Sequence, residues 1–224
     1  MIVHDEPLSF YVDLINSGKN FKFLKFGDGE FYCIRGEAFK SKEFEVTSEI
    51  TFDYRQIINN LRPHHLNALQ PLVTRTPELH HLVPPGIEWY NADVFHKASI
   101  AGELEPFFDC LQEKNVVLVC NEYMSGVAKY FANCHHQIII SDKNCYPDKD
   151  YVMGQIDEFQ VDTVFLLSAS VLSEYIIYHS REDCTFIDAG SIFEPFMGRA
   201  IRSYHHKMSE ETIKKNLGKY YDKF

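Results

Sequence analysis

The chain has 224 residues, enough to bury the core of one domain, and we predict a single domain spanning residues 1–224. A composition of 45% hydrophobic and 24% charged residues is that of a folded globular protein and excludes an intrinsically disordered chain. A formal net charge of −10 argues against nucleic acid as a partner, because binding to phosphates depends on clusters of basic residues.

The first half of the sequence alternates between helical and strand patterns. Residues 7–15 predict a helix, and the short apolar run at 21–26 predicts a buried strand. Residues 50–61 again carry apolar side chains at helical spacing. After a proline-rich stretch, the aromatic segment at 87–95 is interpreted as another strand.

The second half is more regular. Apolar runs rich in β-branched residues predict strands covered on both faces at 116–120, 137–140, 163–167 and 185–187. Segments of helical length lie at 125–134, 148–159 and 170–179. This alternation predicts an α/β fold with a Rossmann-like, mostly parallel sheet and helices on both faces.

The loops at the carboxyl ends of these strands carry candidate binding residues, because ligands of open parallel sheets bind at that edge. Hydroxyl groups and free backbone N–H groups at a helix start can bind a phosphate. Helix capping alone would also explain any one of these loops. The candidates are Ser125, Gly126, Ser168, Ser170, Asp188, Gly190 and Ser191.

The stretch FGDGEF, residues 26–31, places Asp28 and Glu30 one residue apart on a loop expected to follow the strand at 21–26. Two ionised carboxylates this close repel each other, and a divalent cation such as Mn²⁺ or Mg²⁺ would remove the repulsion. Gly27 and Gly29 would let the backbone turn tightly beside a bulky diphosphate. The residues alone leave two readings open, a metal and phosphate site or a solvated acidic turn.

The run FLKFGDGEF, residues 23–31, resembles the Arg-Phe-Gly-Asp-Gly-Glu signature of bacterial glycosyltransferases with the GT-D fold. In that family an Asp-x-Glu motif replaces the Asp-x-Asp of other metal-dependent glycosyltransferases. The segments FLLSAS at 165–170 and TFIDAGS at 185–191 are similar to the family's apolar strand, small-residue loop, helix and closing Asp-x-Gly segment. The similarity in order and spacing extends over roughly residues 10–196, and it implies an α/β fold with a Rossmann-like sheet.

The resemblance implies transfer of a sugar, hexose or pentose, from a nucleotide diphosphate donor to a glycan acceptor, as in polysaccharide biosynthesis. A UDP-sugar is the expected donor. Asp28 and Glu30 would hold Mn²⁺ or Mg²⁺ with the donor diphosphate, and a base would take the proton of the acceptor hydroxyl. The candidate bases are Asp93, His96 and Glu122.

Two positions depart from the family pattern. The arginine of the signature is Lys25 here, which keeps the charge but lacks the planar fork that binds a phosphate through two bonds. A residue that is often histidine after Asp-x-Gly is Ser191 here. We expect both residues to line the donor pocket.

Four His-His pairs do not predict a metal site, because adjacent side chains on a helix or strand diverge. The pairs are His64-His65, His80-His81, His135-His136 and His205-His206. Six cysteines without CxxC spacing, and an N-terminus without a signal pattern, predict reduced thiols and a cytoplasmic location. No apolar stretch approaches the roughly 20 residues of a membrane-spanning helix, so no integral membrane segment is expected.

Two other classes of function stay open. An S-adenosylmethionine-dependent methyltransferase also suits an α/β sheet, but its first loop normally has three glycines at GxGxG spacing, and only Gly27 and Gly29 are present. A non-catalytic module that binds a nucleotide or a sugar would keep the fold and lack turnover.

Overall fold

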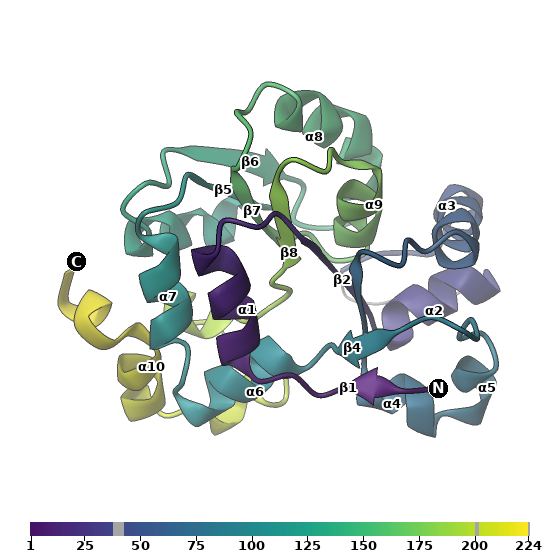
Figure 1. Cartoon of the computed structure of the whole chain (residues 1–224), viewed down its shortest axis with the longest axis horizontal. Coiled ribbons are helices and arrows are strands. Elements are labelled where there is room, and N and C mark those ends of the chain that lie inside the picture. The colour runs from purple at the N-terminus through teal and green to yellow at the C-terminus, as the bar shows by residue number, and fades with distance from the viewer. Residues whose placement is uncertain (38–42, 200–201, 224) are drawn as a thin grey trace.

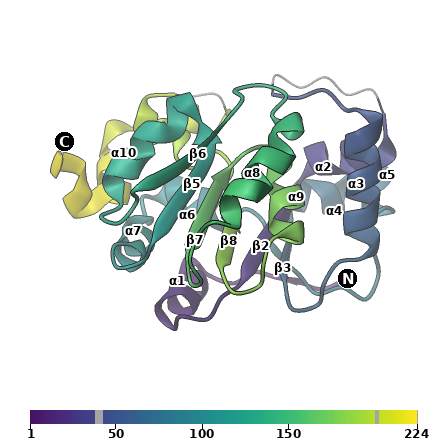
Figure 2. The same ribbon diagram turned by 90° about the horizontal axis from the view of Figure 1, so that it is seen from above.

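The computed structural model describes residues 1–37, 43–199 and 202–223 of the chain. Its centre is one eight-stranded sheet in the order β1-β4-β3-β2-β8-β7-β5-β6, and each pairing is parallel. The strands are β1 (Val3–His4), β2 (Lys22–Phe26), β3 (Leu66–Leu69), β4 (Trp89–Asn91), β5 (Val116–Asn121), β6 (His136–Ile140), β7 (Val164–Ser168) and β8 (Thr185–Asp188). Figure 2 shows the strands from β6 to β3 side by side. The predicted α/β fold with a Rossmann-like parallel sheet is confirmed.

Helices cover both faces of the sheet (Figure 1). The α-helices are α1 (Leu8–Asn16), α2 (Asp28–Arg35), α3 (Ser48–Asn59), α4 (Pro71–Arg75), α5 (Pro77–His80), α6 (Val94–Ala101), α7 (Glu105–Leu111), α8 (Lys149–Ile156), α9 (Leu172–His179) and α10 (Glu210–Leu217). The 3₁₀ helices are η1 (Glu122–Tyr130), η2 (Tyr146–Asp148), η3 (Glu194–Met197), η4 (His205–Lys207) and η5 (Gly218–Lys223). Within the described ranges, none of these helices has the length and hydropathy of a membrane span.

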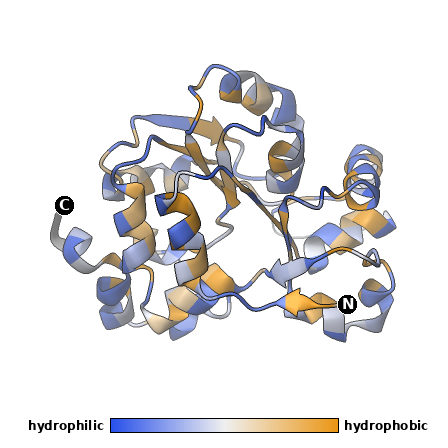
Figure 3. Cartoon of the chain, in the orientation of Figure 1, coloured by the Kyte–Doolittle hydropathy of each residue, from blue (hydrophilic) through white to orange (hydrophobic). Residues whose placement is uncertain are grey.

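The hydrophobic core consists of two clusters, one on each face of the sheet. Side chains of α2, α3, α8 and α9 pack on one face, and those of α1, α6, α7 and η1 pack on the other. Alternate residues of a strand therefore serve different clusters, as Phe186 and Ile187 of β8 do. The central strands are mostly hydrophobic (Figure 3), which is the pattern of a parallel sheet buried on both faces.

Three local expectations are wrong. The acidic stretch 26–31 is not a loop, because α2 begins at Asp28, two residues after β2 ends. The segment 87–95 is a strand only over Trp89–Asn91. The strand ends there because the Asn91 side chain accepts a hydrogen bond from the Asp93 N–H at 2.8 Å, which forms a turn before α6 begins. The helix expected at 125–134 is the 3₁₀ helix η1, which begins earlier because Asn121 caps it through the Met124 N–H at 3.1 Å.

Candidate functional site

The first turn of α2 carries the acid pair. Gly27 has an extended conformation and caps the helix, and Asp28 is its first residue. The Glu30 carboxylate accepts a hydrogen bond from the Gly27 N–H at 2.7 Å, and Asp28 accepts one from the Gly29 N–H at 3.0 Å. The two acids therefore satisfy backbone donors that a helix start leaves unpaired, and the helix dipole favours their negative charge.

A buried ion pair lies between the ends of β2 and β8. Lys25 Nζ is 3.2 Å from Asp188 Oδ2, and the two side chains are only 13% and 6% exposed. Asp188 Oδ1 accepts a hydrogen bond from the Gly190 N–H at 2.8 Å, so both oxygens of this carboxylate are held. Gly190 has a φ of +57°, and a Cβ atom there would lie 2.2 Å from Lys25 Nζ. Glycine is therefore the residue that fits beside the lysine.

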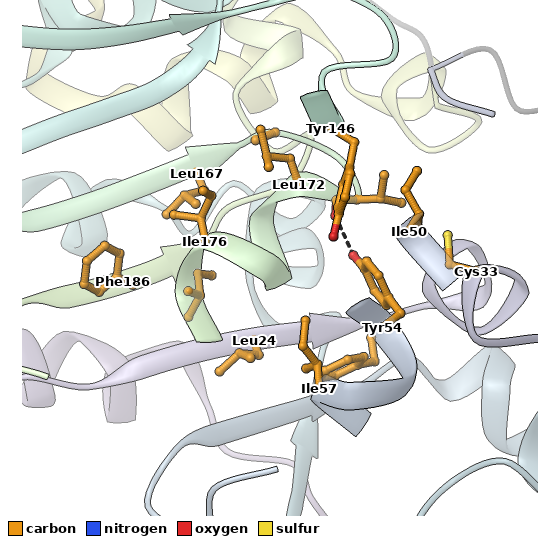
Figure 4. Close-up of a cluster of buried hydrophobic side chains, with 14 of the residues drawn as sticks. Leu24, Cys33, Ile50, Tyr54, Ile57, Tyr146, Leu167, Leu172, Ile176 and Phe186 are labelled. Atoms are coloured by element: carbon orange, nitrogen blue, oxygen red, sulfur yellow. Dashed lines mark hydrogen bonds between the residues drawn. The ribbon is translucent and has the colours of Figure 1, made fainter. Parts of the chain in front are cut away.

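The helix α9 adds a third carboxyl group, Glu174, which is 1% exposed. Its Oε2 lies 2.9 Å from the Tyr54 hydroxyl, which is itself 2.7 Å from the Val171 carbonyl oxygen. Figure 4 shows Tyr54 and its hydrogen bond inside the hydrophobic cluster. Glu174 Oε1 is buried without a hydrogen-bond partner among the described residues. Burial raises the pKa of Glu174 well above its usual value, and the charges of Asp188 and Glu30 raise it further.

The charges of this cluster do not balance. Burial alone would lower the pKa of Lys25, but the carboxyl groups of Asp188, Glu174 and Glu30 outweigh that effect and raise it. Burial raises the pKa of Glu30 to about 7, against the hydrogen bond from Gly27 and the charge of Lys25. One ammonium group thus faces the buried carboxyl groups of Asp188 and Glu174 and the half-buried one of Glu30, so ionisation of all three calls for a further positive charge.

His96 and Asp93 approach the same cluster from the start of α6. His96 Nε2 is buried without a hydrogen-bond partner in the described part of the chain, 3.8 Å from the position of a Cβ atom on Gly190. The His96 ring packs on Tyr204 with 5.1 Å between the centroids, and its Nδ1 is 3.9 Å from Asp93 Oδ1. Burial and then the charge of Lys25 lower the pKa of His96 well below its usual value, so this imidazole is neutral. Burial raises the pKa of Asp93.

Three of the expected serine hydroxyls bond to other parts of the chain. The pairs are Ser191 with the Tyr204 hydroxyl (2.7 Å), Ser168 with the Gly190 carbonyl oxygen (2.6 Å) and Ser170 with Glu43 Oε2 (3.1 Å). These bonds join the loops after β7 and β8 to each other and to two more distant segments. Tyr204 in particular brings the C-terminal part of the chain to the site.

Ser125, Gly126 and Glu122 lie in η1, at the end of β5. In the sheet, β8 and β7 separate β5 from β2. Glu122 is exposed, and among the described residues it takes part in none of the hydrogen bonds or ion pairs that connect Lys25 with its neighbours. The structure therefore brings Asp93 and His96 to the acid cluster and leaves Glu122 apart from it.

Asp28 and Glu30 are the side chains that could hold a cation at α2. Over residues 1–37, 43–199 and 202–223, neither belongs to a group of three His, Cys, Asp or Glu ligand atoms within 4.8 Å of one another. A cation held there would keep coordination positions for water and for phosphate oxygens. That arrangement is typical of Mg²⁺ and Mn²⁺, and the carboxylate oxygens are the hard ligands that both ions take.

Sequence reasoning did not single out Glu174, Tyr54 or Tyr204. Glu174 has a sequence signal, because it lies one helical turn from the apolar residues Val171 and Ile177. A charged residue in that position is either paired or neutral when the helix packs on a sheet. Tyr54 and Tyr204 have no such signal, since each reaches the site only through the tertiary fold.

Together these features define an α/β protein whose parallel sheet carries a cluster of acids and one lysine at its carboxyl edge. The chain superposes on a glycosyltransferase from Streptococcus sanguinis, of the domain-of-unknown-function 1792 class, with a TM-score of 0.69 at 15% identity, over 88% of this chain and 86% of that one. A second structure of domain of unknown function 1792, described as a distinct glycosyltransferase fold, gives a TM-score of 0.68 at 13% identity, over 95% and 94% of the two chains. No protein-family model matches the sequence, and the search of curated proteins gives no match. The chain thus has the GT-D glycosyltransferase fold, as the resemblance implied.

Proposed function

We propose that this protein is a metal-dependent glycosyltransferase that moves a hexose or pentose from a nucleotide diphosphate sugar to a hydroxyl of a glycan acceptor. The expected donor is a UDP-sugar, and the expected cation is Mn²⁺ or Mg²⁺. The similarity in fold to a glycosyltransferase supports the class of reaction. The acids at the start of α2 support the dependence on a metal.

One observation carries the proposal. Helix N-termini at the carboxyl edge of a sheet commonly bind phosphates through free N–H groups. In α2 the N–H groups of Gly27 and Gly29 already bond to Glu30 and Asp28, and these two carboxylates repel an anion. A diphosphate at this helix therefore needs a cation between itself and the acids.

The residues of the cluster have separate tasks in this proposal. Asp28 and Glu30 hold the cation, which when bound would neutralise the diphosphate and improve the nucleotide as a leaving group. Lys25, fixed by Asp188, keeps one positive charge at the same edge of the sheet. A bound cation would also offset the free-energy cost of ionising the half-buried Glu30 carboxyl group.

Asp93 is the base we favour for the acceptor hydroxyl. Its side chain is 32% exposed and open to an acceptor, whereas that of His96 is 13% exposed. Burial raises the pKa of Asp93 and lowers that of His96, so Asp93 has the greater gain in proton affinity. His96 packs between Asp93 and Tyr204 and would orient the carboxylate.

Calorimetric titration with UDP-, GDP- and TDP-sugars, with and without Mn²⁺, tests the proposal. Binding of one donor should require Mn²⁺ and should weaken at least tenfold in Asp28→Ala and in Glu30→Gln. Glutamine keeps an acceptor for the Gly27 N–H, so the second variant separates loss of metal from loss of the helix cap. Glu211→Ala is the matched control, because Glu211 is an exposed acid in the first turn of α10.

Each other result would count against the transferase. Binding of the donor without metal, or no binding, would contradict the role of the acid pair. Binding of S-adenosylmethionine instead would favour the methyltransferase. Metal-dependent binding without hydrolysis or transfer of the sugar would favour a binding module.

A further inference from the structure

A second group of metal-ligating side chains lies at the amino edge of the sheet, opposite to α2. His64 and His65 precede β3, and Glu182 precedes β8. His65 Nε2 is 3.3 Å from Glu182 Oε1, and His64 Nε2 is 3.5 Å from Glu182 Oε2. One ligand atom from each residue lies within 4.8 Å of the other two, and this is the one such group in the described ranges. We propose that His64, His65 and Glu182 form a binding site for Zn²⁺.

The two histidines converge although adjacent side chains were expected to diverge. That expectation holds on a helix or a strand, but His64 lies in a turn and His65 in a bend before β3 begins at Leu66. The His64 and His65 rings are 4.6 Å apart between centroids. The turn thus places both imidazoles beside a single carboxylate.

The ligand types suit tetrahedral zinc. Bonds of about 2.0–2.1 Å from zinc to imidazole nitrogen and carboxylate oxygen give edges of about 3.3 Å between neighbouring ligand atoms. The nitrogen–oxygen distances of 3.3 and 3.5 Å run to different oxygens of Glu182, and the three ligand atoms lie within 4.8 Å of one another, so both imidazoles would have to close in on one carboxylate oxygen to complete three ligand positions. Water can take the fourth position, because His64 is 63% exposed. Two imidazoles and one carboxylate favour Zn²⁺ over Mg²⁺ or Mn²⁺, which take oxygen ligands.

Lys22 and Arg62 also bind Glu182, and their effect on a metal has to be weighed. Both contact Oε1, at 2.9 Å in the case of Lys22, and leave Oε2 beside His64. They fix the carboxylate as partners of metal ligands commonly do, while their positive charge lowers the affinity for a dication. Arg62 is 37% exposed and can be neutralised without opening the core.

The site would connect three neighbouring strands. In the sheet, β2 lies between β3 and β8, and Lys22 is its first residue. The pairing of β2 with β8 covers only Lys22 with Phe186 and Phe23 with Ile187. A metal joining the residues before β3 and β8 would stabilise the folded state by mass action, because the unfolded chain does not hold the three ligands together.

The test is calorimetric titration of ZnCl₂ into the metal-stripped full chain, with thermal unfolding as a second readout. Saturable binding and a rise in Tm are expected for the parent. His64→Gln should weaken binding at least tenfold, and Arg62→Gln should tighten it several-fold. His135→Gln is the matched control, since His135 is also the exposed first member of a His-His pair and should leave binding unchanged.

The outcomes separate this site from the one at α2. Loss of zinc binding in Asp28→Ala but not in His64→Gln would assign the ion to α2 and overturn the inference. Equal binding by the parent and by His64→Gln, or no saturable binding, would overturn it as well. None of these results depends on sugar transfer.

Discussion

Glu194, the first residue of η3, is an acid beside the candidate site with a side chain only 14% exposed. Its Oε2 lies 3.3 Å from His205 Nδ1, which accepts a hydrogen bond from the Arg202 N–H at 3.2 Å and so carries no proton. An ionised Glu194 would face the lone pair of that nitrogen. Burial raises the pKa of Glu194 to about 7, against the charge of Arg202, so the folded protein holds this carboxyl protonated more strongly than the unfolded chain does.

Glu194 should therefore make stability fall with rising pH. A carboxyl whose pKa is higher in the folded state contributes stability that is complete below the unfolded value of about 4.5 and is lost as pH rises towards 7. Glu194→Gln removes this titration. Between pH 5 and pH 8 the parent should lose roughly 2 kcal/mol more unfolding free energy than the variant, measured by urea unfolding at both pH values. Equal losses in the two proteins would mean that Glu194 is ionised at both pH values.

At the scale of elements, the buried side chain of Asn216 joins α10 to the rest of the molecule by hydrogen bonds, beside the buried Leu217. Asn216 is fully buried, accepts a hydrogen bond from the Leu104 N–H at 3.1 Å and donates one to the Ser99 carbonyl oxygen at 2.7 Å. Both partners belong to the α6–α7 region, which also carries Asp93 and His96. The hydrogen bonds of Asn216 thus help to hold α6, the helix that begins directly after the candidate base Asp93.

Asn216→Ala should cost about 2–4 kcal/mol of unfolding free energy, because it leaves a buried N–H and a buried carbonyl group without partners. Urea unfolding of the purified variant measures the loss. Lys215→Ala, at the exposed neighbouring position in an ion pair with Glu211, should cost less than about 1 kcal/mol. A similar loss in both variants would show that the effect is general to α10 rather than specific to the amide.

The elements differ in how well the sequence predicts them, for physical reasons. Strands β5, β7 and β8 were predictable because burial on both faces leaves a continuous apolar run. The start of α2 was not, since Asp28 and Glu30 suit a turn as well as a first helical turn, and only the bond from Glu30 to the Gly27 N–H decides between them. That bond follows the spacing of a capping box, with glycine in place of the usual serine or threonine.

The candidate site was likewise predictable only in part. Residues at the carboxyl ends of neighbouring strands, such as Lys25 and Asp188, meet because parallel strands end at one edge. Glu43 and Tyr204 reach that edge from segments far along the chain, and no local pattern encodes such an approach. The convergence of His64 with Glu182 likewise depends on which strands are neighbours in the sheet.

At the scale of the whole molecule, the two hydrophobic clusters share the strands between them. Phe186 of β8 stacks on Phe165 with 4.7 Å between centroids and an interplanar angle of 5°, while the adjacent Ile187 packs in the other cluster. A loss of packing at Phe186 therefore destabilises β8, which contributes to both hydrophobic clusters and lies between β2 and β7 in the sheet. This continuity predicts that residues 1–224 unfold as one cooperative unit.

Two probes at different places test that prediction. The single tryptophan, Trp89, is buried in β4 and reports on one side of the sheet, whereas far-UV circular dichroism reports on all helices and strands. Urea transitions followed by the two probes should coincide in the parent. Phe186→Ala should lower the unfolding free energy obtained from both probes by about 3–5 kcal/mol. Phe52→Ala, at a 63% exposed phenylalanine of α3, should leave both values nearly unchanged. If Phe186→Ala moved the dichroism transition and left the Trp89 transition in place, the β4 side would be a separate folding unit, because its strands would then persist without the packing at β8.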